Sequence, residues 1–342
     1  MPNRKKKDEL TTAMDWGLAG EDIALASVIT TWGSAPRPVG SLLVISGNGL
    51  FEGSVSGGCV EGAVVSEALD ILKSGRPKVM EFGISNTNAW EVGLACGGNI
   101  AILVAMVEQK NIPLLKRLNK MRGAGAPLVL ATRFSDGALA LYSEGAWAEA
   151  DDPSFWNGFS EVAEAALAAD ASRVAGDQKT GVFLNVILPP PRLFVVGAVH
   201  VAQSLIPVAS LAGYDVSLID PRGAFAEASR FPDAHIIEDW PDNVLKAANL
   251  DRRSAVVALS HDPKFDDAAL AVALKSPCFY IGALGSKKTH ASRVERLLDA
   301  GFSPAEVARI NGPVGLAIGA KTPAEIAISI LAQVTEARRK PV

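Results

Sequence analysis

The chain of 342 residues has little cysteine and little histidine, with three Cys and four His. An odd number of widely spaced cysteines does not indicate a disulfide framework, so free thiols in a reducing, cytoplasmic setting are expected. No C-x-x-C pair occurs, and no histidine precedes His200. Because structural zinc sites are built from such ligands, no metal site is predicted.

Long apolar runs and a strong charge excess are also lacking. No segment approaches the roughly 20 apolar residues of a membrane span, so none is expected. The formal net charge of −4 gives no reason to expect a nucleic-acid partner. The basic run at 4–7 is not followed by an apolar segment and is interpreted as a solvated tail, not a secretory signal. With 49% apolar and 20% charged residues, the chain has the composition of a globular protein long enough for two domains.

Hydrophobic periodicity predicts an α/β first half with a mixed sheet. Val60, Val64, Ala68 and Ile71 fall at helical spacing, and Gly75 then marks the end of that helix. The predicted helices of this half are 8–18, 60–73, 113–122 and 159–174, and residues 144–158 are expected to be a loop. The predicted strands are 22–32, 41–46, 50–55, 78–84, 99–107, 127–133 and 138–143.

Three consecutive prolines at 189–191 mark the clearest boundary, because such a run favours a stiff, extended connector. The predicted domains are therefore 1–188 and 192–342. Beyond the prolines, short apolar strands alternate with helices, which predicts a Rossmann-like, doubly wound parallel sheet. The predicted strands are 193–197, 215–219, 255–259 and 278–282, and the predicted helices are 201–212, 287–300 and 323–338.

The stretch 192–222 has the layout of a dinucleotide-binding unit. A buried strand leads to Gly197, a helix follows, and the next strand ends in Asp220, which in this layout bonds a ribose hydroxyl. However, Val199 stands where a second glycine normally lets the backbone touch a pyrophosphate, and Ala202 takes the third position. Val199 therefore counts against binding of NAD(P), and a Rossmann scaffold with another use is the alternative.

Two further loops follow strands of the second domain, "ALSHDP" at 258–263 and "YIGALGSKKT" at 280–289. Ligands of open α/β sheets bind at the carboxyl ends of strands, so these loops are expected to converge. The helix that begins in the 280–289 loop is expected to hold a phosphate at its N-terminus. The alternative is a hydrogen-bonded turn histidine and a solvated helix start. The predicted site residues here are Gly197, His200, Asp220, Arg222, His261, Gly282, Gly285, Ser286 and Lys287.

The stretch "GSVSGGCVEGAVV" at 53–65 places Cys59 between glycines and a helix start. Glycine-rich backbone can form an anion-binding nest, and a helix N-terminus favours a thiolate. Cys96 lies in a second glycine loop, and Arg37 offers a fork for an oxyanion. Alternatively, these cysteines are small packing residues, the role expected for Cys278. The predicted site residues here are Arg37, Ser56, Gly57, Gly58, Cys59, Glu61, Cys96, Gly97 and Gly98.

Six motifs occur in order along the chain, namely "TTWGSAPRPVGSLLVISGNGLFEGSVSGGCVEGAV", "ACGGNI", "VVGAVHVAQ…DPR…RFPDA", "LSHDPKFD", "YIGALGSKK" and "INGPVGLAIGAKTPAEIAISILA". They resemble the motifs of the XdhC/CoxI family, accessory proteins of molybdenum hydroxylases such as xanthine dehydrogenase and aerobic carbon monoxide dehydrogenase. Two departures from the family pattern bear on nucleotide binding, namely Val199 in the Rossmann loop and Lys287–Lys288 where the family is more often arginine-rich.

The resemblance implies a chaperone that binds the molybdenum cofactor (molybdopterin), supports its sulfuration and delivers it to an apo-molybdenum hydroxylase. It leaves a cysteine desulfurase as partner and a homodimer open. No acid/base pair in the first domain suggests turnover, so an accessory factor is expected rather than an enzyme. The competing hypotheses are an NAD(P)-binding oxidoreductase using the second domain, and an interaction scaffold in which both glycine loops are structural.

Overall fold

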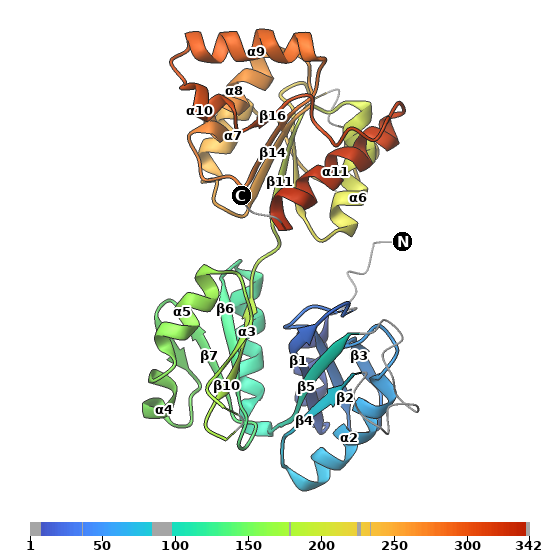
Figure 1. Cartoon of the computed structure of the whole chain (residues 1–342), viewed down its shortest axis with the longest axis vertical. Helices are drawn as coiled ribbons and strands as arrows, with labels where there is room; N and C mark the ends of the chain where they lie inside the picture. Colours follow the sequence, from blue (N-terminus) through green and yellow to red (C-terminus); the bar gives the residue numbers. More distant parts are fainter. Residues whose placement is uncertain are drawn as a thin grey trace. The chain divides into compact units, whose positions relative to one another are not determined.

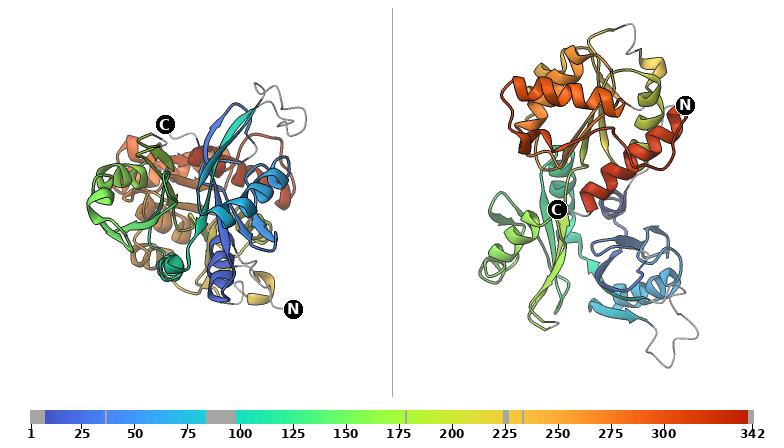
Figure 2. Two further views of the ribbon diagram at one scale, coloured as in Figure 1. Left: turned by 90° about the horizontal axis from the view of Figure 1, so that it is seen from below. Right: turned by 45° about the horizontal axis from the view of Figure 1, so that its top comes forward.

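The computed structural model describes residues 8–35, 37–83, 98–177, 179–223, 227–232 and 234–339. The chain divides into two compact units, Met1–Pro189 and Pro190–Val342, which are described separately. Figure 1 colours them from blue to green and from yellow to red, and Figure 2 gives two further views.

The N-terminal unit begins with a five-stranded antiparallel sheet in the order β3-β2-β1-β5-β4. One face of the sheet is covered by α2, whose Val64, Ala68 and Ile71 pack on a buried apolar layer that includes Ala26 and Ile102. The helical spacing of these side chains explains why the segment forms an amphipathic helix. The elements are α1 (Glu9–Leu18), β1 (Ile23–Trp32), β2 (Leu42–Ser46), β3 (Phe51–Gly53), α2 (Glu61–Ser74), β4 (Lys78–Phe82) and β5 (Asn99–Val107).

A second antiparallel sheet in the same unit has the order β8-β7-β6-β10-β9. The opposite face of the first sheet packs on it through a cluster that contains Leu103, Phe134 and Phe183. The elements are η1 (Gln109–Asn111), α3 (Ile112–Gly123), β6 (Leu128–Arg133), β7 (Leu139–Ser143), β8 (Ala146–Ala148), α4 (Pro153–Asn157), α5 (Ser160–Ala168), β9 (Arg173–Ala175) and β10 (Val182–Ile187).

The C-terminal unit is built on a six-stranded parallel sheet in the order β13-β12-β11-β14-β15-β16. Its elements in chain order are β11 (Arg192–Val196), α6 (His200–Leu211), β12 (Asp215–Ile219), η2 (Ala228–Arg230), β13 (His235–Ile237), α7 (Pro241–Ala247), β14 (Ser254–Ala258), α8 (Pro263–Leu274), β15 (Tyr280–Ala283), α9 (Lys287–Asp299), α10 (Pro304–Val307), β16 (Ile310–Asn311) and α11 (Pro323–Arg339).

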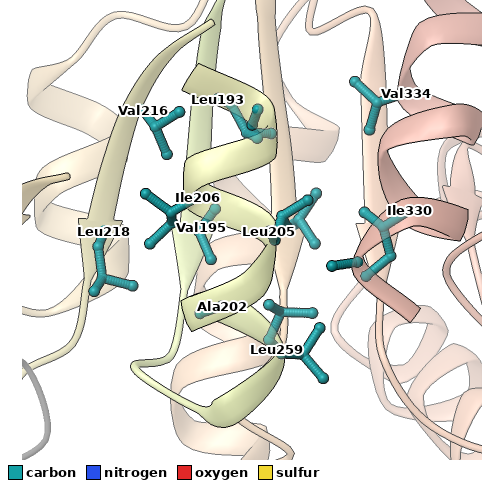
Figure 3. Close-up of a cluster of buried hydrophobic side chains, with 14 of the residues drawn as sticks. Leu193, Val195, Ala202, Leu205, Ile206, Val216, Leu218, Leu259, Ile330 and Val334 are labelled. Atoms are coloured by element: carbon teal, nitrogen blue, oxygen red, sulfur yellow. The ribbon is translucent and has the colours of Figure 1, made fainter. Parts of the chain in front are cut away.

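Helices cover both faces of this parallel sheet. On one face, Leu205 and Ile206 of α6 and Ile330 of α11 pack against Val195 and its neighbours, as Figure 3 shows. The other face is covered by α7, α8 and α9 through a second buried cluster. Because both faces are buried, the strands read as continuous apolar runs, which is why the sequence predicts a parallel sheet.

The predicted fold class is confirmed. In the N-terminal unit, every recorded strand pairing is antiparallel and there are two sheets, where a mixed sheet was expected. The expected loop at 144–158 is wrong in part, because it contains β8 and α4. Asp152 caps α4 by accepting a hydrogen bond from the Phe155 amide, and Trp156 is fully buried. The expected helix at 159–174 ends at Ala168, and Asp170 follows with a positive φ of 50°.

Within the described residues, no helix is both long enough and apolar enough to cross a membrane.

Candidate functional site

The strand order brings several predicted site segments to one edge of the first sheet. Trp32, at the end of β1, pairs with Asn99, at the start of β5, and Phe82, at the end of β4, pairs with Ile100. The chain enters β2 from this edge, and β3 runs toward it. The loop with Arg37, the loop after β3 and the flanks 83 and 98 therefore share one edge. Cys96 and Gly97 lie outside the described residues.

The glycine-rich loop is organised around one carboxylate, that of Glu61 in the first turn of α2. Its Oε1 accepts hydrogen bonds from the Ser54 hydroxyl at 2.7 Å, from the Val55 amide at 3.2 Å and from the Ser56 amide at 2.9 Å. Its Oε2 accepts a bond from the Gly58 amide at 2.9 Å and another from the Ser56 hydroxyl. The loop therefore folds around the carboxylate of Glu61, an anion that belongs to the chain itself.

The expectation of an open nest is wrong for these amides, because Glu61 fills it. The side chain of Glu61 is only 7% exposed. Burial alone would raise the pKa of this carboxyl, but the hydrogen bonds from Ser56, Ser54 and the backbone outweigh burial and lower the pKa to about 2. The Gly57 amide is bonded to the Ser54 hydroxyl at 2.9 Å. Glu61 therefore shapes the loop, and donors of the chain itself occupy its carboxylate.

Cys59 is exposed, in contrast to Cys278, which is buried and 6% exposed. The interpretation of Cys278 as a packing residue is confirmed, and burial raises the pKa of its thiol. In the part of the chain that the structure describes, no hydrogen-bond partner is recorded for the amides of Cys59, Gly62 and Ala63. Cys59 thus lies on a fixed loop, beside unpaired amides at the N-terminus of α2.

Arg37 lies against this loop. Its Nε donates a 3.2 Å hydrogen bond to the carbonyl oxygen of Ser54, and among the described residues no partner is recorded for its two Nη groups. The loop that carries Arg37 is fixed at its end, where the Gly40 amide bonds to the Val28 carbonyl at 2.9 Å and Asn185 donates to the Gly40 carbonyl at 3.2 Å. The guanidinium is therefore anchored through one nitrogen and keeps a fork for an anion.

Gly98, the remaining predicted residue of this group, packs tightly. A Cβ on it would lie 2.9 Å from the carbonyl oxygens of Trp32 and Ser34. This close approach fixes the start of β5 against the end of β1.

In the C-terminal unit, the strand order places the carboxyl ends of β12, β11, β14 and β15 side by side. Gly197 follows β11 with a φ of 103°, and a Cβ there would lie 2.8 Å from the backbone of Ser260, which follows β14. Gly197 is therefore required both for the turn and for this close approach. The loops after β11 and β14 are in direct contact.

Asp220 is used within the chain. Its Oδ2 accepts hydrogen bonds from the Ala198 amide at 2.8 Å and from Arg222 Nη2 at 2.7 Å, and its Oδ1 accepts two further bonds from Arg222. Burial would raise the pKa of Asp220, but these bonds lower it below its usual range. A ribose hydroxyl would have to displace Arg222 before Asp220 could bind it, so the predicted contact with a ribose is not preformed.

The other predicted residues of this unit fall into two groups. His200, His261, Ser286 and Lys287 are at least partly exposed at the carboxyl edge, and Ser286 caps α9 by accepting a hydrogen bond from the Thr289 amide. The φ of His261 is +63°, consistent with a turn residue. In the second group, Gly282 is buried within β15, where a Cβ would lie 2.6 Å from Val314, so packing alone requires glycine there. Gly285 begins the turn into α9 with a φ of 146°.

A buried ion pair near this edge was missed by sequence reasoning. Arg293 and Asp266 are 2% and 1% exposed, and Arg293 Nη2 lies 3.4 Å from Asp266 Oδ2 and donates to the Leu284 carbonyl at 3.1 Å. Asp266 also accepts bonds from the amide and hydroxyl of Ser260. Burial raises the pKa of Asp266 despite these partners. The signal was helical spacing, because Arg293 lies four residues before buried Leu297.

No group of three or more His, Cys, Asp and Glu side chains able to hold a metal ion occurs among the residues that the structure describes.

These features define a class of protein with an exposed cysteine on a glycine-rich loop in one unit and a Rossmann-like sheet in the other. Residues 16–83 match the model of the XdhC and CoxI family, and residues 193–334 match that of the XdhC Rossmann domain. The chain belongs to the XdhC and CoxI family.

Similar proteins span nearly the whole chain. Molybdenum cofactor insertion chaperone PaoD of Escherichia coli is 29% identical over 333 residues, which cover 96% of this chain and 87% of PaoD. A Bacillus subtilis protein named as a probable xanthine dehydrogenase subunit is 27% identical over 94% of each chain. A crystal structure described as a xanthine dehydrogenase from Bacillus halodurans has a TM-score of 0.77 and 26% identity, and it covers 98% of this chain and 97% of its own.

Proposed function

We propose that this protein is a chaperone that binds the molybdenum cofactor as cargo and inserts it into a molybdenum hydroxylase. The observation that carries the proposal is the fixed loop that presents the exposed thiol of Cys59. Arg37 is bonded to Ser54 of the same loop, and its two Nη groups have no recorded partner among the described residues. Membership in the XdhC and CoxI family and similarity to a relative named as a molybdenum cofactor insertion chaperone support it.

The chemistry of the cargo matches these residues. The cofactor carries a phosphate, a dithiolene and a metal with oxo or sulfido ligands. A guanidinium fork suits a phosphate, and a thiolate is a soft ligand for such a metal. Glu61 takes no part in contact with the cargo in this proposal. It holds the loop so that the thiol stays exposed.

The test is the cofactor content of the protein purified from cells that make molybdopterin. The expected result is molybdenum and the fluorescent oxidised pterin in comparable molar amounts, with a clear loss of both in Cys59→Ala. Cys278→Ala is the matched control, because that thiol is buried. Absence of both metal and pterin from the wild type, in a host shown to load a hydroxylase, would contradict the proposal.

Finer parts of the proposal concern partners and place. The acceptor is an apo-hydroxylase of the xanthine dehydrogenase or carbon monoxide dehydrogenase type, and the cofactor is held here during its sulfuration, in the cytoplasm. The proposal also includes a cysteine desulfurase as the source of the sulfur and a homodimer of this chain. Activation of each apo-hydroxylase by loaded protein, co-purification with a desulfurase, and sedimentation of the chain test these parts separately.

The NAD(P)-dependent oxidoreductase is the second candidate, and the parallel sheet with the tight turn at Gly197 favours it. The occupied carboxylate of Asp220 counts against it. Calorimetric titration with NADH and NADPH tests this candidate. A thermal melt is the second measurement, because a ligand at about one hundred times its Kd stabilises a protein by about 2.7 kcal/mol and raises its melting temperature. No heat and no shift would eliminate this candidate.

A further inference from the structure

A hollow of about 230 Å³ lies at the same edge of the first sheet as the Cys59 loop, over the ends of β1, β4 and β5. It is smaller than the about 300–1,000 Å³ of a pocket for a drug-sized ligand. It therefore suits one ring system better than a complete cofactor.

The sheet register explains why there is a hollow here. Thr30, Ala101 and Glu81 form one row across three strands, and Trp32 and Asn99 form the next row. Side chains in such rows point to the same face of a sheet. This is the face away from α2, because Ala101 packs with the cluster that faces the second sheet. The small side chain of Ala101 leaves space between the larger ones.

Gly83 makes room for the side chain of Asn99 at the edge of the hollow. The side chain of Asn99 lies so close to Gly83 that a Cβ on that glycine would overlap the amide oxygen of Asn99. Asn99 thus lies over Gly83, which follows β4, and Trp32 lines the same hollow.

The walls of the hollow differ in chemistry. Trp32 is 71% exposed at the end of β1, whose last three residues are not buried. On the far side, no hydrogen bond or ion pair is recorded for the Glu81 carboxylate or the Asn99 amide within the described part of the chain. An indole face with an unpaired carboxylate and amide beyond it is the arrangement that binds a flat ring with polar edges.

We propose that this hollow receives the pterin ring of the cargo, and this inference rests on the proposed function. The ring stacks on Trp32. Its aminopyrimidinone edge donates the ring N–H and the exocyclic amine to Glu81, while Asn99 bonds the neighbouring polar atoms. Arg37 follows Trp32 by five residues in the loop that continues from β1, so the phosphate and the ring are held by one segment.

The experiment is a titration of the full chain with free pterin, compared with lumazine, in which an oxo group replaces the exocyclic amine. The wild type is expected to bind pterin about tenfold more tightly than lumazine. Glu81→Gln is expected to weaken pterin binding about tenfold while changing lumazine binding by less than about threefold. Trp32→Ala is expected to weaken both by about tenfold or more, and Trp32→Phe to keep most of the affinity.

Matched controls keep the test sharp. Phe51→Ala removes another exposed aromatic of the same sheet, and Asp70→Asn removes an exposed carboxylate of α2, so both are expected to bind as the wild type does. Because Trp32 is exposed, its variants are expected to melt as the wild type does. The proposal is overturned if pterin does not bind saturably up to about 1 mM, or if either Trp32→Ala or Glu81→Gln leaves pterin binding unchanged.

Failure of this inference is distinguishable from failure of the proposed function. If Trp32→Ala and Glu81→Gln proteins retain as much molybdenum and pterin from cells as the wild type, the ring subsite is wrong and the chaperone role stands. If the wild type binds free pterin with the expected pattern but never retains cofactor from competent cells, the chaperone role is wrong and the ring subsite stands.

Discussion

Glu61 Oε2 lies 2.9 Å from the amide nitrogen of Gly58, the residue directly before Cys59. This bond joins the first turn of α2 to the loop that carries the thiol. Gly58 has a φ of 115°, which residues with a side chain rarely adopt, so the loop can present its amide to the carboxylate only with glycine at this position. An internal anion thus sets the conformation in which the cysteine is exposed.

Glu61→Gln is expected to destabilise the protein and to remove part of its acid sensitivity. Glu61 has a pKa of about 2 in the folded chain against an ordinary 4.5, so its stabilisation is complete above about pH 5 and is lost as the pH falls toward 2. The shift corresponds to on the order of 3 kcal/mol. Urea unfolding of wild type and variant at about pH 7, 5 and 3 measures it.

Asp70→Asn is the control for this series, because Asp70 is an exposed carboxylate of the same helix. The control is expected to follow the wild-type pH dependence. A Glu61→Gln protein that is as stable as the wild type at about pH 7 and loses stability equally on acidification would show that the loop does not depend on this carboxylate.

Thiol labelling is expected to separate Cys59 from Cys278. In a Cys96→Ser background, one thiol should react rapidly in the folded protein, because Cys59 is exposed. The second should react only after unfolding, because Cys278 is buried and its pKa is raised. Mass spectrometry assigns the labelled residue. Rapid labelling of two thiols in the folded state, or a label on Cys278, would contradict this difference in exposure.

Much of the fold was predictable because local pattern and tertiary packing agree. The apolar spacing from Val60 to Ile71 predicts α2, and the apolar strands beyond the prolines predict the parallel sheet. The helix α8 was not predicted, although it has a typical start signal, with Asp262 as its cap and Pro263 in its first turn. The prediction of a loop at 144–158 was wrong because the structure of this segment depends on burial of Trp156, which no local hydrophobic period reveals.

The candidate site was predictable in its residue types but not in its bonding. A glycine-rich loop shows that backbone amides can gather, but the choice between Glu61 and an external anion is made by side-chain geometry. The same holds for Asp220. Its hydrogen-bond partner Arg222 lies two residues further on, and both residues were expected to bind a ligand. The row of Thr30, Ala101 and Glu81 depends on strand register across a gap in sequence, which a single sequence does not specify.

Gly197→Ala is expected to cost far more stability than Gly213→Ala. Both glycines have positive φ, 103° and 85°, but a Cβ on Gly197 would meet the backbone of Ser260 at 2.8 Å, whereas nothing lies within 4 Å of a Cβ on Gly213. Backbone strain alone costs about 1–2 kcal/mol, and the collision adds to it at Gly197. Chemical denaturation of the two variants measures the difference, and equal losses would refute a tight contact between the loops after β11 and β14.

Two arginines of α9 provide the last comparison. Arg293 is buried with Asp266, whereas Arg296 is exposed and paired with Asp267. Arg293→Met leaves a buried carboxylate without its cation and is expected to cost about 3–5 kcal/mol, while Arg296→Met is expected to cost less than about 1 kcal/mol.

The pH dependence of the Arg293→Met protein identifies the cause of its loss. Burial already raises the pKa of Asp266, and removal of Arg293 should raise it further, so the folded variant holds a proton that the unfolded chain releases. Its stability relative to the wild type should therefore fall as the pH rises from the unfolded pKa toward the folded pKa and recover in mild acid. Asp266→Asn added to Arg293→Met should remove this dependence. A loss that is the same at every pH would instead assign the role of Arg293 to packing of its side chain and not to charge.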